Sequence, residues 1–309
     1  MIVILNRSSN NGHGLRTWDG IRRELEDRWL SPGYRLISGV EELAPNLRDE
    51  ISRGPATVVA AGGDGTVHHL LNGLMSLPED ERRRVVLGAV GLGSSNDFHK
   101  PHSTSHRLDG RVYFKLDSRN ALPHNVGRVD YDDEAGRRRT SYFLLNCSIG
   151  IIAQANHLFN NPDPLLNWLK PRFVMGAIYY AALKTIFSAP DIPATITVGT
   201  ESLTTEVTNL SVVINPHFTG NLSYDFDVDA RSDHFGVGLC ERMGARERLK
   251  TLGSLARARF RGLPKTQSWI ARTIEVRPAR PTALEMDGEV CLAGNIRVHL
   301  LQGYLKVCQ

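Results

Sequence analysis

Three short stretches of this chain combine glycines, hydroxyl side chains and carboxylates in patterns that could perform phosphate chemistry. They are Gly62-Gly63-Asp64-Gly65-Thr66, Gly91-Leu92-Gly93-Ser94-Ser95-Asn96-Asp97-Phe98 and Met286-Asp287-Gly288-Glu289. Closely spaced glycines let a backbone turn tightly and approach a ligand without Cβ obstruction. A carboxylate beside phosphates is repulsive unless a cation lies between them. The stretches therefore indicate a site for magnesium and a nucleotide.

The first stretch stands between a predicted buried strand and a predicted helix. The strand begins at Ala56, and the helical pattern follows through Leu70, Leu71 and Leu74. The N–H groups at the start of such a helix, together with the helix dipole, favour an anion. The alternative interpretation is a glycine-rich turn that binds nothing.

The elements that must position these residues alternate in the first part of the chain. Strand patterns cover residues 2–5, 34–38, 56–61 and 84–90, and helical patterns cover residues 17–29 and 40–53. This alternation predicts a parallel sheet flanked by helices, in which ligands bind at the carboxyl ends of the strands. The polar loops that begin at Asn6, Gly62 and Gly91 all follow predicted strands, so we expect them to converge.

The pattern changes after about residue 121. Strand patterns then recur at residues 125–130, 140–148, 195–198, 205–213, 236–240, 273–276, 282–286 and 296–301. Helical inserts are predicted at residues 165–187 and 245–262. We expect a mainly antiparallel β-sandwich, with domains at 1–121 and 122–309. Whether a final strand at 303–307 returns to the first domain is open at this point.

Composition sets the broad class of protein. The chain has 309 residues, 41% of them hydrophobic, and a formal net charge of +4. This charge is too small to indicate nucleic-acid binding, but it is compatible with an anionic membrane surface. The four scattered cysteines form no metal-binding spacing and are expected to be reduced. No signal peptide or apolar run long enough to span a bilayer is present, so we expect a cytoplasmic protein with peripheral membrane association.

The predicted helix at 245–262 carries alternating basic and apolar side chains, including Arg246, Arg248, Leu249 and Leu252. One interpretation is a helix lying on an anionic membrane with its apolar face toward lipid. The other, which we favour, is a surface helix whose leucines face the β-rich domain.

In their order along the chain, the three motifs resemble the diacylglycerol kinase catalytic family, which includes soluble bacterial lipid kinases and sphingosine and ceramide kinases. Residues 6–14 look like a first phosphate loop of that family, and residues 146–153 resemble its strand leading to a glycine turn. The resemblance implies an NAD kinase/diacylglycerol kinase-like fold: a three-layer α/β domain followed by the β-rich domain. It also implies an ATP-dependent kinase that transfers the γ-phosphate to a hydroxyl of a membrane lipid, with diacylglycerol as the default substrate.

The motifs supply candidate residues for each part of phosphoryl transfer, which needs charge neutralisation, alignment and proton removal. Asp64 and Asp97 are the candidate magnesium ligands, directly or through water. By resemblance Asp287 is the candidate base, supported by Glu289. The alternative for Asp287-Gly288 is a type I′ hairpin turn. The candidate nucleotide-binding residues are Asn6, Gly62, Gly63, Asp64, Gly65, Thr66, Gly93, Ser94, Ser95 and Asn96.

The chain departs from the family pattern at several positions. His68 and His69 stand where many relatives carry Asn and Glu, and we expect packed or solvent-facing imidazoles there rather than catalytic ones. In bacterial relatives, the stretch that corresponds to residues 229–236 usually ends in Asp-Asp-Gly and helps to hold a structural magnesium. Here His234 and Phe235 follow Asp233. A neutral imidazole is a poor ligand for a hard cation, so we predict that this magnesium is absent or weakly held.

Two other functions stay open. NAD kinases share the Gly-Gly-Asp-Gly-Thr motif, although this chain lacks the Asn-x-Gly-x-Leu-Gly-Phe stretch typical of that family. A lipid- or nucleotide-binding protein without catalysis would account for the altered residues, but it would not need the four acids Asp64, Asp97, Asp287 and Glu289. A P-loop NTPase is excluded because no G-x-x-x-x-G-K-[ST] occurs. A homodimer is possible but has no support in the sequence.

Overall fold

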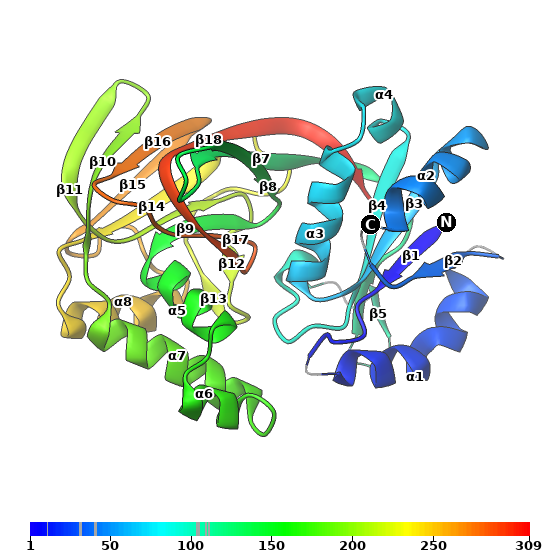
Figure 1. Ribbon diagram of the computed structural model, residues 1–309, viewed down its shortest axis with the longest axis horizontal. Coiled ribbons are helices and arrows are strands. Elements are labelled where there is room, and N and C mark those ends of the chain that lie inside the picture. The colour runs from blue at the N-terminus through cyan, green and yellow to red at the C-terminus, as the bar shows by residue number, and fades with distance from the viewer. Residues whose placement is uncertain (11, 31–32, 40–41, 103–105, 109, 111) are drawn as a thin grey trace. The chain divides into compact units, whose positions relative to one another are not determined.

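The computed structural model describes residues 1–10, 12–30, 33–39, 42–102, 106–108, 110 and 112–309 (Figure 1). Of residues 43–45 and 174–175 it describes the backbone only. The chain divides into two compact units. Unit 1 comprises Met1–Val126 and Gln302–Gln309, and unit 2 comprises Gly127–Leu301. The first boundary therefore lies at residue 126 rather than 121, and the last eight residues belong to the first unit.

Unit 1 is built on a parallel sheet in the order β4-β3-β1-β2. Its strands are β1 (Ile2–Leu5), β2 (Arg35–Ile37), β3 (Ala56–Gly62) and β4 (Val85–Gly91). Its helices are α1 (His13–Arg28), α2 (Leu43–Ser52), α3 (Asp64–Met75), the short α4 (Glu79–Arg82) and the 3₁₀ helix η2 (Asp97–His99). The α/β prediction for this part of the chain is confirmed.

Helices cover both faces of this sheet, so its strands β1, β3 and β4 are buried on both sides almost throughout. Trp18, Ile21 and Leu25 of α1 pack on Val3 and Val59 in one cluster. Side chains that alternate with these on the strands are buried as well, and α2 and α3 pack against β3. Continuous burial along the strands is typical of parallel sheets.

The end of the chain completes the sheet of unit 1. Strand β18 (Glu289–Val307) finishes parallel to β4, with Lys306 opposite Val86 and Val307 opposite Leu87. The Cys308 N–H donates to the Leu87 carbonyl at 2.8 Å. Beyond this contact, β4 pairs antiparallel with β6 (Val112–Lys115), which also pairs with β5 (Arg107–Leu108). The question left open by the sequence is answered: the final strand returns to unit 1.

Unit 2 is mainly antiparallel, as predicted. Its longer strands are β7 (Leu122–Asp132, beginning in unit 1), β8 (Arg138–Phe143), β9 (Asn146–Gly150), β10 (Ile192–Val198), β11 (Glu201–Val213), β14 (Phe235–Glu241), β15 (Thr266–Ala271), β16 (Thr273–Pro278), β17 (Thr282–Met286) and β18. Two short strands, β12 (His217–Phe218) and β13 (Leu222–Ser223), form a separate ribbon.

Two long strands join the sheets of unit 2 because each changes partner along its length. Strand β11 pairs with β10 through residues 201–207 and with β9 through residues 209–213. Its pairing with β14 shifts register between Val207 and Asn209. Strand β18 pairs with β17 at its start and with β16 farther on. Bulges and bends of this kind form the corners where strands switch sheets. The apolar core of unit 2 lies inside the resulting ring of strands.

The helices of unit 2 are α5 (Ile151–Asn160), α6 (Pro164–Leu169), α7 (Val174–Ser188) and α8 (Ala245–Leu255), as Figure 1 shows. The predicted single insert at 165–187 is thus two helices, separated near Pro171, which cannot donate a helical hydrogen bond. Helix α5, which follows Gly150, was not predicted. No helix in the described residues is both long and apolar enough to cross a membrane.

Helix α8 has the orientation that we favoured from the sequence. Leu255 belongs to an apolar cluster with Tyr224 and Phe260, and Thr251 is also buried. The Arg248 side chain is turned inward, where it meets the Asp191 carboxylate at 2.7 Å and backbone carbonyls of residues 186 and 189. The helix ends at Leu255, seven residues earlier than predicted, so residues 256–262 are not helical.

Candidate functional site

The loops that follow β1, β3 and β4 meet at the carboxyl edge of the sheet of unit 1. Gly62 and Gly91 stand opposite each other at the ends of β3 and β4, and the Leu92 N–H donates to the Gly62 carbonyl at 2.8 Å. On the other side, the Asn6 amide donates to the Thr66 hydroxyl at 3.0 Å. The expected convergence of the three loops is therefore present within this unit.

Close packing explains two of the glycines in these loops. A Cβ on Gly93 would lie 2.4 Å from the Gly63 Cα, so the two loop backbones touch. A Cβ on Gly62 would lie 2.1 Å from the Thr66 hydroxyl oxygen. Neither distance is possible for a real side chain. Gly93 is thus required by contact between the two loops and Gly62 by contact with Thr66 of its own loop, whether or not a phosphate also approaches them.

Asp64 links the first glycine loop to the second. Its carboxylate accepts hydrogen bonds from the backbone N–H groups of Asp97 and Phe98, both at 3.0 Å, at the start of η2. Each carboxylate oxygen has a further lone pair, and the residue is half-buried. Asp64 therefore holds the two glycine loops together while it stays only half-buried.

Asp97 is more enclosed than Asp64. Only 4% of the residue is exposed, and its carboxylate accepts a hydrogen bond from Lys100 at 2.7 Å. Since a lysine already neutralises Asp97, this carboxylate is less available to a metal than its place in the motif suggests.

The remaining predicted nucleotide-binding side chains differ in how they are used. Asn96 has a positive φ of 51°, and its amide oxygen accepts the Gly93 N–H at 2.9 Å, which closes the second loop. Thr66 is buried. Ser94 is exposed and Ser95 is half-buried. The two serines are therefore the hydroxyl groups of this loop that reach solvent.

The two histidines after the glycine loop match the expectation of packed and solvent-facing rings. His68 is buried, and its Nε2 lies 3.3 Å from the Asn72 amide nitrogen. His69 is exposed, with its ring centroid 5.7 Å from that of His68.

In unit 2, Asp287 and Gly288 form the two-residue turn between β17 and β18. Both have positive φ, 50° and 94°, and Met286 pairs with Glu289 across the turn. This is the hairpin that the sequence offered as the alternative interpretation, and Asp-Gly is a typical sequence for it. The turn does not exclude a catalytic role, because that role depends on what the carboxyl groups of Asp287 and Glu289 contact.

The Asp287 carboxylate is buried and holds a neighbouring loop. It accepts hydrogen bonds from the backbone N–H groups of Leu144, Leu145 and Asn146 at 2.8, 2.9 and 3.2 Å. Only 5% of the residue is exposed. These contacts lie where the predicted single strand at 140–148 breaks into β8 and β9. Asp287 therefore has an anchoring function that the sequence did not reveal.

Glu285 is a third carboxyl in this hairpin, and sequence reasoning missed it. It is 2% exposed and accepts hydrogen bonds from the Ser148 hydroxyl and the Gly288 N–H, both at 2.6 Å. With its amide turned to donate, Asn146 lies 3.1 Å from the same carboxyl group. Burial, together with the smaller effect of the nearby Asp287 and Glu289 charges, raises the pKa of Glu285 to about 8. In the sequence this residue stands inside an apolar strand pattern, without a motif of its own.

Glu289 is the most accessible of the three hairpin acids, being half-buried at the first position of β18. Asp287 and Glu285 are both buried. Glu289 is thus the acid of this cluster best able to meet a substrate hydroxyl.

The predicted weak metal position has arginine partners. The Asp229 carboxylate accepts the backbone N–H of Arg231 at 2.7 Å and has the Arg231 guanidinium at 3.8 Å, and Asp233 meets Arg272 and His234, both at 2.6 Å. Among the residues that the structure describes, no three His, Cys, Asp or Glu side chains are grouped to hold a metal. The statement about a structural magnesium stays a prediction, to be tested with the ion present.

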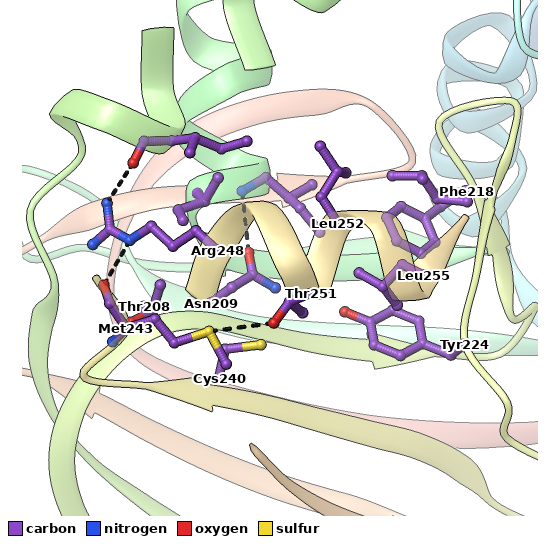
Figure 2. Close-up of a pocket in the computed structure, with 14 residues that line it drawn as sticks. Thr208, Asn209, Phe218, Tyr224, Cys240, Met243, Arg248, Thr251, Leu252 and Leu255 are labelled. Atoms are coloured by element: carbon purple, nitrogen blue, oxygen red, sulfur yellow. Dashed lines mark hydrogen bonds between the residues drawn. The ribbon is translucent and has the colours of Figure 1, made fainter. Parts of the chain in front are cut away.

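An apolar cavity of about 70 Å³ lies in unit 2 between α8 and the sheet (Figure 2). It is lined by Leu252 and Leu255 of α8, and the ring of Tyr224 forms part of its wall. Arg248 stands at its border, where carbonyl groups and Asp191 satisfy the charge. The other lining residues are Ile151, Ile152, Ile186, Thr208, Asn209, Phe218, Leu222, Cys240, Met243 and Thr251.

Polar side chains connect this cavity to the acidic hairpin. The Tyr224 hydroxyl and the Asn209 amide both donate to the Ser211 hydroxyl at 3.0 Å. Ser211 pairs across the sheet with Ser148, which donates to Glu285. The wall of the cavity and the hairpin acids are therefore separated by one pair of strands within the same unit.

Comparison with known proteins supports the motif assignment. Residues 1–112 match the family model described as "Diacylglycerol kinase catalytic domain". A protein of Yersinia pestis (strain Pestoides F) named "Probable lipid kinase YegS-like" is 51% identical over 76 residues, a quarter of each chain. An identically named protein of Yersinia pseudotuberculosis (strain IP 31758, serotype O:1b) matches equally well. The resemblance inferred from the three motifs is thereby confirmed for the N-terminal part of the chain.

A solved structure shares the whole fold. The structure of a "putative diacylglycerol kinase from Bacillus anthracis str. Sterne" covers 99% of this chain, which in turn covers 94% of that one, with a TM-score of 0.71 at 17% sequence identity. At this identity the likeness establishes the fold. Both the α/β unit and the β-rich unit therefore have a counterpart in a protein given that name.

Proposed function

We propose that this chain is an ATP-dependent lipid kinase that transfers the γ-phosphate of ATP to a hydroxyl of a membrane lipid, with diacylglycerol as the substrate. The observation that carries the proposal is the presence, in one chain, of a kinase-type glycine edge in unit 1 and of an acidic hairpin near an apolar cavity in unit 2. The family match over residues 1–112 supports the kinase part. The apolar cavity supports a lipid rather than a soluble acceptor such as NAD.

In this proposal, unit 1 binds the nucleotide. The N-terminus of α3 and the loops ending β1 and β4 form a polar edge suited to phosphates. Asn6, Thr66 and Asn96 hold these loops in shape, and Ser94 and Ser95 reach the nucleotide. Asp64 would hold magnesium, directly or through water, with Asp97 farther back beside Lys100. Magnesium commonly uses one or two carboxylates together with substrate phosphates, and it would neutralise phosphate charge.

Unit 2 contributes the lipid-binding and proton-accepting groups. We assign proton removal from the lipid hydroxyl to Glu289, because it is the accessible acid of the hairpin. Asp287 attaches the hairpin to the β8–β9 loop by accepting three backbone N–H bonds from that loop. Glu285 stabilises the turn by accepting the Gly288 N–H. This revises the sequence-based proposal, in which Asp287 was the base and Glu289 its support.

The apolar cavity would accept part of an acyl chain. A lipid assay with matched variants tests this assignment. Leu252→Trp on α8 places a larger side chain in the cavity, whereas Leu249→Trp changes an exposed position on the same helix that does not line it. We expect Leu252→Trp to lower turnover of long-chain diacylglycerol about tenfold or more, because the indole would occupy the space offered to the acyl chain and a loss of about 1.4 kcal/mol in binding is a factor of ten. Short-chain diacylglycerol should be affected much less.

The same assay separates the alternatives. Labelled ATP is offered with diacylglycerol micelles, with NAD and with no acceptor, and products are identified by mass. Phosphorylated NAD would favour the NAD kinase alternative. Lipid binding without phosphate transfer would favour the inactive relative. Equal turnover by the Leu252→Trp and Leu249→Trp variants on long-chain lipid would reject the cavity as the acyl site.

A further inference from the structure

The segment formed by α6 and α7 exposes an unusual amount of apolar surface. It carries six of the twelve large hydrophobic side chains that are exposed in the described part of the chain. Phe187 and Phe173 are 65% and 61% exposed, and Trp168 is 55% exposed. The other three are Leu165, Tyr179 and Leu183. Single exposed hydrophobic residues are ordinary, but a concentration within one segment marks an interaction surface.

Helix α7 is apolar on two opposite faces. Tyr179, Leu183 and Phe187 are spaced four residues apart and form an exposed stripe. The buried stripe, at Ala177, Ala181 and Thr185, has the same spacing and packs toward α5 and α6. A helix that is apolar all round is normally covered on all sides. In unit 2 alone, α7 is covered on one side.

The charges of the segment identify the kind of partner. Residues 164–188 contain Lys170, Arg172 and Lys184 and no acidic residue. The neighbouring Asp163 accepts hydrogen bonds from Lys184 at 2.6 Å and from Tyr180 at 2.9 Å. The Arg172 guanidinium lies 4.9 Å from the centre of the Trp168 ring. Exposed aromatic and aliphatic side chains beside cations are typical of helices that lie in the headgroup region of anionic membranes.

We propose that this surface, the α6–α7 face, docks the protein on an anionic lipid bilayer, with the stripe of α7 entering the boundary between headgroups and acyl chains. The proposal rests on the proposed function, since a kinase acting on a membrane lipid has to reach a bilayer. Helix α8, which the sequence offered as the membrane helix, lacks such a face. Thr251 and Leu255 are buried, and Leu249, at 37%, is its one leucine among the exposed large hydrophobic side chains of the described residues.

Vesicle sedimentation with matched variants tests the docking face. The full chain is mixed with phosphatidylcholine vesicles with and without phosphatidylglycerol. We expect the triple variant Y179S/L183S/F187S to bind the anionic vesicles at least about tenfold more weakly than wild type, because three apolar side chains no longer enter the bilayer. Ile270→Ser, a change at a 54% exposed position on β15 of the same unit, should bind like wild type.

Trp168 supplies an independent measurement. It is the most exposed of the four tryptophans, so its emission should shift to shorter wavelength on anionic vesicles and be quenched by brominated lipids. The shift should be absent in Trp168→Phe. Removing phosphatidylglycerol or raising salt should weaken binding several-fold, since screening reduces the attraction of Lys170 and Arg172.

Three results would overturn the proposal: no vesicle binding by wild type, equal loss in the triple variant and in Ile270→Ser, or a wild-type dimer in sedimentation velocity that the triple variant converts to monomer. The last result would assign the face to a second copy of the chain. Because vesicle binding is measured without ATP, it can succeed where the kinase assay fails. If both hold, the triple variant should lose activity on vesicle-embedded diacylglycerol and keep it on a dispersed short-chain analogue.

Discussion

The glycine edge of unit 1 and the acidic hairpin of unit 2 use an aspartate in the same way but leave it in different surroundings. Asp64 and Asp287 both accept backbone N–H groups of a neighbouring loop. Asp64 stays half-buried, whereas Asp287 is 5% exposed. A motif carboxylate can therefore serve folding, chemistry or both, and its remaining exposure distinguishes these functions better than its motif does.

The largest expected effect is in the hairpin, where the half-buried Glu289 and the buried Asp287 can be tested separately for catalysis and stability. We expect Glu289→Gln to lower kcat by about 10²–10⁴, the usual contribution of a general base, with a free energy of unfolding within about 0.5 kcal/mol of wild type. Asp287→Asn turns an amide NH₂ toward backbone donors, so it should cost about 1–3 kcal/mol of stability. Kinase assays and urea unfolding of both variants provide the measurements. A stable, inactive Asp287→Asn beside an active Glu289→Gln would restore Asp287 as the base.

The glycine edge can be tested by a pair of glycine substitutions. Gly93→Ala introduces a Cβ 2.4 Å from the Gly63 Cα, so the two loops must separate. We expect a loss of about 1–3 kcal/mol in the free energy of unfolding and weaker ATP binding. Gly20→Ala in α1 is the control, because a Cβ there meets nothing within 4 Å. It should be neutral or stabilising by up to about 1 kcal/mol. Equal effects in the two variants would contradict close contact between the loops.

A smaller effect, the pH dependence of the free energy of unfolding, tests the burial of Glu285 in the hairpin. Its pKa is raised from 4.5 to about 8, so the folded protein keeps a proton that the unfolded chain has lost. The stabilising contribution is complete below about pH 4.5 and is lost as pH rises through about 8. Relative to Glu285→Gln, wild type should therefore lose on the order of 1 kcal/mol or more between pH 5 and pH 8. Parallel urea titrations of the two proteins measure this; a constant difference would mean that Glu285 is already ionised at pH 5.

The sequence predicted what is encoded locally. The strand, glycine loop and helix around Gly62 follow from neighbouring residues, and the parallel arrangement follows from the alternation of strands and helices. The turn at Asp287-Gly288 was likewise visible, because Asp-Gly favours a two-residue hairpin.

What the sequence missed depends on contacts between distant residues. Glu285 gains its importance from Ser148, on another strand, and Asp287 from the N–H groups of residues 144–146. The exposed stripe of α7 was indistinguishable from a core helix, because both of its faces are apolar. Closure of the ring in unit 2 depends on where β11 and β18 change partner, which the alternation of side chains does not encode.

Strand β18 gives the protein a particular order of assembly during synthesis. Its first residues pair inside unit 2, and its last residues pair with β4 of unit 1. Residues 302–309 leave the ribosome only after the whole of unit 2 has been made. The unit that is translated first is therefore completed last, and until then the free edge of β4 beside Val86 and Leu87 is open to pairing with other chains.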